Sequence, residues 1–201
     1  MKNSFKSRTT RDAILDATDR LLTRNGYKKM TIDDLAKEVG IGKGSVYLHF
    51  ASKEEIALSH IDRIIERLKV NLREIALKPI PCEARLKAML IERVMYRFDS
   101  VQHYSQSLND LLSHLRPRLL ERRRRYFEEE AEIFCSVIEE GVVSGILAGH
   151  KPANAARSLL DATNALLPYS LSANELGERA DIEKKAKSIA DLILKGLIKR
   201  L

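Results

Sequence analysis

Residues 31–50 constrain the fold of this chain more than any other segment, because they join two short helical patterns through a glycine-containing turn. Thr31 can cap the first helix, and Asp34, three residues later, can complete a capping box. Gly40 can take the left-handed conformation that ends a helix. The second helix begins at about Lys43 and is too short and too polar at its start to fill a core. This arrangement predicts a helix-turn-helix, which presents its second helix to the DNA major groove.

The second of these helices, about residues 43–49, has an inward and an outward face. Val46 and Phe50 lie four residues apart and face inward. The outward side chains are those of Lys43, Ser45, Tyr47, Leu48 and His49. Residues 39–53 contain two lysines and no acidic residue, which suits contact with DNA.

A long helix is expected from residue 53 to about residue 77, with Ser52 as its cap and Glu55 as the partner of that cap. Lys53 opposes the helix dipole in the first turn, unless an anion such as a phosphate lies beside it. The alternative is a solvated lysine that Glu54 and Glu55 offset. At 1.5 Å per residue the helix spans roughly 37 Å, enough to start beside DNA and end in a second domain.

The N-terminal part of the chain resembles the TetR family of bacterial transcriptional regulators. The resemblance is ungapped over roughly residues 10–58, about a quarter of the chain. It is carried by Arg11–Ala17, Asn25–Tyr27, Met30–Ala36, Val39–Ile41, Lys43–Phe50 and Ser52–Glu55. It implies a homodimer whose N-terminal helices bind a palindromic operator, and whose helical C-terminal domain dimerises and holds a small effector.

The outward face and the resemblance together predict a set of DNA-binding residues. They are Thr31, Lys43, Gly44, Ser45, Tyr47, Leu48, His49 and Lys53. The lysines, the tyrosine and the histidine of this set are expected at phosphates, in keeping with their counterparts in the family. Ser45 and Leu48 are the candidates for base edges, through a hydrogen bond and through packing on a thymine methyl. Gly44 allows the backbone to approach DNA closely.

Composition predicts an all-α chain, and the resemblance implies two domains, 1–52 for DNA binding and 53–201 for effector binding and dimerisation. Its 201 residues are 44% apolar, prolines and glycines are few, and no alternating strand pattern stands out. The net charge of +7 permits DNA binding without requiring it. Cys82 and Cys135 are isolated, so neither a disulfide nor a zinc site is indicated. Without a membrane-span pattern or a signal peptide, we expect a cytoplasmic protein.

Helices are expected along the whole chain, with Pro117 opening the longest of them. Their approximate ranges are 9 or 10 to 25, 32–39, 43–49, 53–77, 82–100, a short helix ending near 115, 117–145, 152–167 and 180–200. The last two have apolar stripes that need a partner. We expect a dimer interface at Ala155, Leu159, Ala162, Ile182, Ile189, Ile193 and Leu197. Docking within the same subunit is the alternative.

An effector cavity is expected in the C-terminal domain. Its candidate lining residues are Phe98, Tyr104, Phe127, Phe134 and Asn164. Asn164 interrupts an apolar helix, and a buried amide needs a hydrogen-bond partner, which a ligand, a water or another helix could supply. In the alternative, the aromatic residues close the core, and Asn164 faces solvent or the dimer interface. The run Arg122–Arg125 is expected to pair with Glu121 and Glu128–Glu130 rather than to bind DNA.

These patterns favour a DNA-binding transcriptional regulator, a repressor released from its operator by an effector. No motif for metal binding, cofactor binding or catalysis is found, so an enzyme is not expected. Two alternatives remain open: a DNA-binding auxiliary or architectural factor without an effector, and a helical-bundle enzyme or carrier. The acid-free surface of residues 42–53 argues against the second alternative.

Overall fold

The computed structural model describes residues 9–101, 105–148, 151–167 and 177–198, with residues 105–112 described as backbone only. Apart from one isolated bridge between Leu147 and Ile198, the described residues are helical or irregular, so the expected all-α fold is confirmed. The helices are α1 (Thr10–Lys29), α2 (Ile32–Val39), α3 (Lys43–His49), α4 (Lys53–Ala76), α5 (Cys82–Val101), α6 (Ser105–Val143), α7 (Pro152–Thr163), the 3-10 helix η2 (Asn164–Leu166) and α8 (Arg179–Leu197). None of them combines the length and the apolar character that a membrane span requires.

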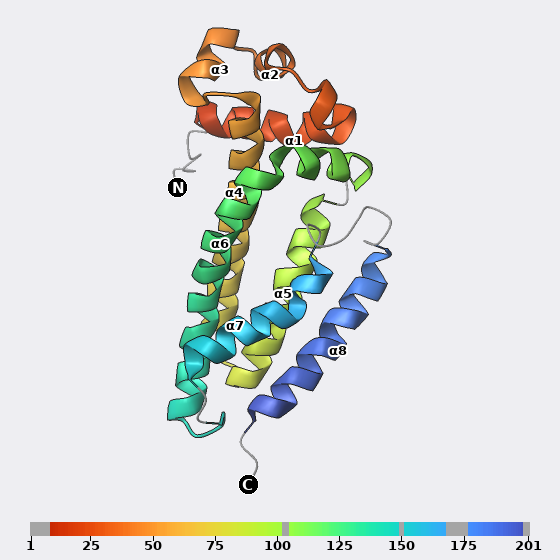
Figure 1. Cartoon of the computed structure of the whole chain (residues 1–201). Helices are drawn as coiled ribbons and strands as arrows, with labels where there is room; N and C mark the ends of the chain where they lie inside the picture. Colours follow the sequence, from red (N-terminus) through yellow and green to blue (C-terminus); the bar gives the residue numbers. More distant parts are fainter. Residues whose placement is uncertain (1–8, 102–104, 149–150, 168–176, 199–201) are drawn as a thin grey trace, which may run out of the picture.

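The first three helices form one end of the molecule, and the long helices extend away from it (Figure 1). α4 leads from α3 along the length of the body, where α5 packs against α4, α6 and α8. α7 crosses the body on the side of α6 (Figure 1). The position of α4 therefore makes it the covalent link between the helix-turn-helix and everything that follows.

Two helix ends differ from the sequence-based prediction. We expected the first helix to end at Asn25, and the helical path does break at Gly26, where φ is 71°. One further turn then carries α1 to Lys29. The expected separate helix starting at Pro117 is wrong, because α6 continues through Pro117. Proline removes one helical hydrogen bond but can be accommodated at a bend, and Figure 1 shows α6 turning from beneath α1 to run beside α4.

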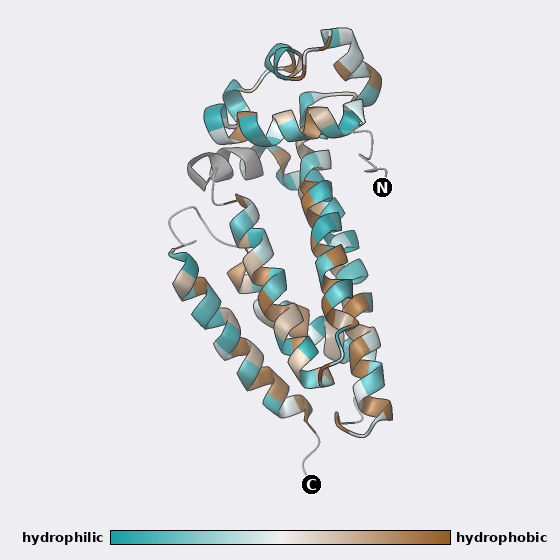
Figure 2. Cartoon of the chain, turned by 180° about the vertical axis from the view of Figure 1, so that it is seen from behind, coloured by the Kyte–Doolittle hydropathy of each residue, from teal (hydrophilic) through white to brown (hydrophobic). Residues whose placement is uncertain are grey.

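The apolar core falls into two clusters. One unites α1, α2 and α3 with the adjoining ends of α4, α5 and α8, and includes Ile14, Leu35 and Phe98. The other fills the far half of the body between α4 and α8, and includes Leu72 and Phe134. The helices of the body carry both hydrophobic and hydrophilic residues, as amphipathic helices around a shared core do (Figure 2). The helix-turn-helix is thus packed directly onto the body.

Candidate nucleic-acid interface and effector region

The helix-turn-helix is held by the local contacts that its sequence predicts. The hydroxyl of Thr31 accepts from the Asp34 amide at 3.1 Å, and the Asp34 carboxylate accepts from the Thr31 amide at 3.1 Å. Gly40 has φ 78°, and its amide donates to the Ala36 carbonyl at 2.9 Å. Val46 is fully buried on the inner side of α3. These contacts fix α3 on α2 and determine which of its side chains remain in solvent.

The outer face of α3 is exposed as expected. Leu48 is 86% exposed and Tyr47 is 50% exposed, so neither side chain packs fully into the core. Lys43 and His49 are also exposed, while Ser45 is half-buried. A Cβ added at Gly44 would meet no atom within 4 Å. Nothing inside the protein therefore requires glycine at position 44.

Lys43 has an acidic neighbour that the sequence did not place beside it. Its ammonium lies 2.9 Å from a carboxylate oxygen of Asp33 on α2, and both side chains are about half exposed. Hydrogen bonding to Asp33 raises the pKa of Lys43 above its ordinary value. The surface around residues 42–53 is therefore not free of acid, and a DNA phosphate would have to compete with Asp33 for Lys43.

Lys53 is turned toward the protein rather than toward solvent. Its ammonium donates to the carbonyls of Tyr27 and Met30, each at 3.0 Å, and lies 4.5 Å from the centre of the Tyr27 ring. Burial lowers the pKa of Lys53. Carbonyls at a helix C-terminus lack partners within the helix and attract cations. Lys53 thus fastens the start of α4 to the end of α1, and its geometry gives the expected phosphate contact no support.

The aromatic candidate effector residues that the structure describes are divided between the two apolar clusters. Phe98 belongs to the cluster beside the helix-turn-helix, whereas Phe127 and Phe134 belong to the far cluster. Tyr104 lies outside the described residues. The Asn164 amide oxygen accepts from Arg93 at 2.9 Å, so another helix supplies the partner that this side chain needs. The pocket that the described residues outline between α7 and α8 is lined by none of this set.

Sequence analysis missed a buried ionic cluster formed by Arg93 and Arg97 of α5 and Glu130 of α6. Arg93 donates to Glu130 at 2.7 Å, and Arg97 donates to the other oxygen of that carboxylate. Burial alone would raise the pKa of Glu130, but Arg97 and Arg93 outweigh it and hold the pKa below its ordinary value. We expected Glu130 to pair with the run Arg122–Arg125, which was wrong. The available signal was the placement of two arginines on the apolar face of α5.

The expected dimer residues divide into inward and outward positions. Ala155, Leu159 and Ile182 are buried within the subunit, so Ile182, which is 2% exposed, cannot also form a dimer contact without rearrangement. Ala162 is exposed, and Ile189, Ile193 and Leu197 are half-buried. A pocket of about 330 Å³ opens between α7 and α8. It is lined by Lys151, Asn154, Ala155, Ser158, Leu159, Ile193 and Leu197. Elsewhere on α8, Leu192 is 74% exposed.

The sequence of the helix-turn-helix region is similar to that of a known protein family. The helix-turn-helix with an exposed second helix defines a DNA-binding protein of the major-groove class. The family model of the bacterial regulatory proteins of the tetR family matches residues 14–59. The N-terminal part of the chain is therefore similar to the bacterial regulatory proteins of the tetR family.

Relatives and solved structures extend the likeness over the whole chain. The fatty acid metabolism regulator protein of Bacillus subtilis is 24% identical over 191 residues, covering 92% of this chain and 93% of that protein. A transcriptional regulator from Cytophaga hutchinsonii has the same fold, with a TM-score of 0.77, 23% identity and coverage of 92% and 97%. The regulator FadR from Bacillus subtilis, in complex with stearoyl-CoA, has a TM-score of 0.64, 18% identity and coverage of 92% and 98%. These proteins are named as regulators, in agreement with the expectation that the chain is not an enzyme.

Proposed function

We propose that the chain is a homodimeric repressor that binds a palindromic operator and is released from it by a small-molecule effector. Residues 1–52 would bind DNA, and residues 53–201 would hold the effector and dimerise. The observation that carries the DNA-binding part is the outer face of α3, where Lys43, Tyr47, Leu48 and His49 are exposed while Val46 holds the opposite side in the core. A leucine in that position has no folding role and is available to pack on a thymine methyl.

Each exposed group of the helix-turn-helix has a role in this proposal. Lys43, Tyr47 and His49 contact phosphates and set the position of α3, which accounts for affinity but carries no sequence information. Ser45 and Leu48 read base edges, and Gly44 allows the backbone of α3 to approach the DNA. Thr31 stands at the N-terminus of α2, where a helix attracts a phosphate.

Selection of DNA duplexes from a random pool tests this proposal. The wild-type chain should enrich a palindrome whose half-sites lie about one helical turn, or 34–36 Å, apart or at a somewhat larger offset. Leu48→Ala should change the preference at one or two positions of each half-site by about 1–3 kcal/mol. Identical base preferences for the wild type and Leu48→Ala would remove Leu48 from the readout. Failure to enrich any sequence would overturn the proposal that the chain is a sequence-specific DNA-binding regulator.

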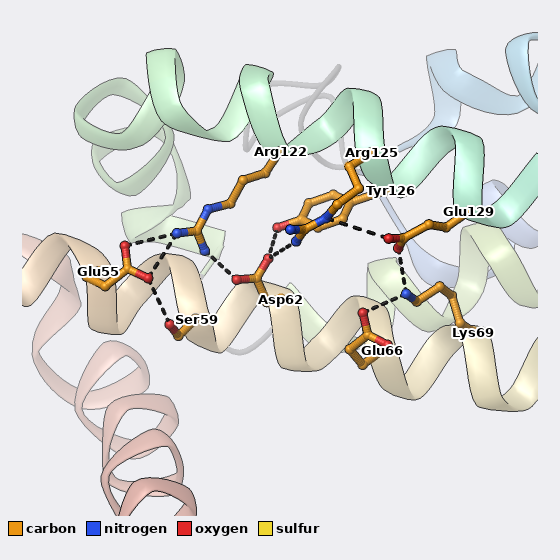
Figure 3. Close-up of polar contacts among 9 residues, drawn as sticks. All are labelled: Glu55, Ser59, Asp62, Glu66, Lys69, Arg122, Arg125, Tyr126 and Glu129. Carbon is orange, nitrogen blue, oxygen red and sulfur yellow. Dashed lines mark hydrogen bonds and ion pairs between the residues drawn. The ribbon is translucent and has the colours of Figure 1, made fainter. Parts of the chain in front are cut away.

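A chain of polar contacts between α4 and α6 supports the effector-release part (Figure 3). Both oxygens of Glu55 accept from Arg122 at 2.9 Å. Arg122 also donates to Asp62, which in turn accepts from Arg125 at 3.1 Å and from the Tyr126 hydroxyl. One face of α4 is thereby bonded to one face of α6 over several turns.

The same line continues down the body through Lys69. Its ammonium lies 2.6 Å from carboxylate oxygens of Glu66 on α4 and of Glu129 on α6 (Figure 3). We call the nine residues of Figure 3 the α4–α6 ladder. Because α4 continues directly from the helix-turn-helix, a shift of α6 carried by the ladder would reorient α3. In a dimer, a modest change in the separation of two recognition helices lowers operator affinity steeply.

The bound stearoyl-CoA of Bacillus subtilis FadR supports an effector for a chain of this fold. The alternative is a DNA-binding auxiliary or architectural factor with no effector. The two are separated by operator affinity measured with and without candidate small molecules. An effector with the usual coupling of about 1–3 kcal/mol changes the affinity some 5–150-fold, whereas an auxiliary factor shows no change with any ligand.

A further inference from the structure

We propose that Arg97 binds the negatively charged group of the effector, and that the effector is an anion with an apolar body. This inference rests on the proposed effector function. It begins with two buried arginines of α5. Arg93 is 1% exposed, Arg97 is 6% exposed and Glu130 is fully buried, and both guanidinium groups bind the one carboxylate of Glu130. A guanidinium cannot lose its proton, so the charge of Arg97 cannot be removed by titration.

Arg93 is well supplied with acceptors. Besides Glu130, it donates to the Thr163 hydroxyl at 2.8 Å, to the Leu160 carbonyl at 3.1 Å and to the Asn164 amide oxygen at 2.9 Å. These groups stand at the C-terminus of α7, where the helix dipole favours a cation. The burial of Arg93 is therefore compensated by the protein itself.

Arg97 has fewer hydrogen-bond acceptors than Arg93. It donates to Glu130 and, at 3.2 Å, to the Arg93 carbonyl. Among the described residues, its Nε has no acceptor. A buried donor on a charged group without a partner is unfavourable, and an anion that supplied the missing acceptor would relieve it. Carboxylates and phosphates match the planar fork of a guanidinium.

The surroundings of Arg97 determine the rest of the ligand. Val94 and Val101 lie three residues before and four residues after it, on the same face of α5. Val94 is fully buried, Val101 packs against the same apolar cluster, and Phe98 is part of it. A ligand held at Arg97 would therefore place its uncharged part against apolar side chains, which a small inorganic ion could not use.

Entry to this position requires a structural change. Because Arg97 is almost completely enclosed and is bonded to Glu130 of α6, a ligand reaches it only when α5 and α6 separate locally. The ligand would thus stabilise an opened arrangement of α6 over the closed one. The α4–α6 ladder joins α6 to α4, so the same opening would act on the helix-turn-helix.

The test uses the full chain and three probes with the same twelve-carbon body: dodecanoate, dodecyl phosphate and 1-dodecanol. Binding is measured by calorimetry and by thermal unfolding, without DNA. At least one of the two anions should bind the wild type and raise its unfolding temperature, and the better of the two identifies the charged group. The alcohol should bind at least about tenfold more weakly, because it cannot make the charge-assisted hydrogen bonds.

Arg97→Met should weaken the anion by about tenfold or more and leave the affinity for the alcohol unchanged. Arg85→Met is the matched control. Arg85 is also 6% exposed, and its Nε also lacks an acceptor, but it has a carboxylate of its own in Glu140. The Arg85→Met variant should therefore bind the anion with the same affinity as the wild type.

Three results would overturn the proposal: no binding of either anion to the wild type, equal affinity for anion and alcohol, or unchanged anion affinity in Arg97→Met. If Arg97→Met does not fold, the comparison of anion with alcohol in the wild type still decides. Operator affinity is measured separately. If the anion binds at Arg97 but leaves operator affinity unchanged, the site stands and the release mechanism fails.

Discussion

The DNA-reading end of the molecule and its body treat charged groups differently. On the α2–α3 surface, Lys43 and Asp33 form an ion pair in which each side chain is about half exposed. In the body, Arg93 and Glu130 form one in which neither side chain is more than 1% exposed. Exposed pairs contribute little to stability, whereas breaking a buried pair leaves an uncompensated charge. The first region can therefore exchange its partners for DNA phosphates, while the second must keep its own.

The largest expected effect comes from the buried carboxylate. Glu130→Gln would remove the carboxylate that Arg93 and Arg97 share and should lower the free energy of unfolding by about 3–5 kcal/mol. Urea denaturation measures this directly. Glu128→Gln is the control, because Glu128 pairs with Arg157 on the surface and should change stability little. Similar losses in both variants would contradict the contrast between buried and exposed pairs.

The same carboxylate should make stability dependent on pH. The pKa of Glu130 in the folded chain lies below its ordinary value of 4.5. Its contribution is therefore fully present above pH 4.5 and is lost as the pH falls through the lower, folded-state pKa. Stability measured from pH 6 down to about pH 3 should fall less steeply in Glu130→Gln than in the wild type. Parallel curves would show that Glu130 is not held as a carboxylate.

A substitution at Leu192, on the surface of the body, tests whether α7 and α8 form the proposed dimer interface. Its side chain is 74% exposed in the subunit, so Leu192→Glu should fold normally. If α7 and α8 pair with a second copy, a buried glutamate should weaken the dimer by about 2 kcal/mol or more. Light scattering over a dilution series would detect the shift to monomer. Leu77→Glu changes another exposed leucine, at the end of α4, and should leave the dimer intact. Loss of the dimer in both variants, or in neither, would place the interface elsewhere.

The contrast between the two regions also explains how much could be predicted from the sequence. The helix-turn-helix depends on residues close together in the chain, such as Thr31 with Asp34 and the turn at Gly40. Its helices α2 and α3 have the predicted bounds, and the outer face of α3 is exposed as predicted. Local capping and spacing rules are sufficient there, because few distant contacts compete with them.

The sequence predicted side-chain partners less well where the two residues are far apart in the chain. Glu130 is 37 positions from Arg93, and Lys53 is 26 positions from Tyr27, so no periodicity connects them. Helical spacing placed Glu130 beside Arg122–Arg125, because a single helix offers only its own neighbours as partners. The inward and outward faces of α8 were likewise indistinguishable until the packing of α5 was known. Pro117 was misjudged for the same reason, since packing of α6 on α1 and α4 accommodates the bend.

Variants of Lys43 and Lys53 test whether an exposed lysine that binds phosphate and a lysine that stabilises the fold lie close together in the helix-turn-helix. Lys43→Ala should reduce the slope of log affinity against log salt by about 1 and leave stability unchanged. Lys53→Ala removes hydrogen bonds to the carbonyls of Tyr27 and Met30 and should cost about 1 kcal/mol of stability. DNA-binding titrations at several salt concentrations and denaturation of both variants separate the cases. A reduced salt slope with intact stability in Lys53→Ala would show that this lysine turns to a phosphate on binding, as the family resemblance implies.

The cleanest separation of folding from DNA binding is expected at Gly44. A Cβ at this position meets no atom within 4 Å, and Gly44 lies inside α3. Alanine is the better helix former, so Gly44→Ala should raise the free energy of unfolding by about 0.5–1 kcal/mol. If the backbone of α3 approaches the DNA closely, the same variant should bind the operator more weakly, and the bulkier Gly44→Gln should not bind it. Denaturation and operator titration of the two variants measure both quantities. Wild-type operator affinity in Gly44→Gln would mean that α3 does not approach the DNA through this residue, and a loss of stability in Gly44→Ala would mean that the glycine serves the fold.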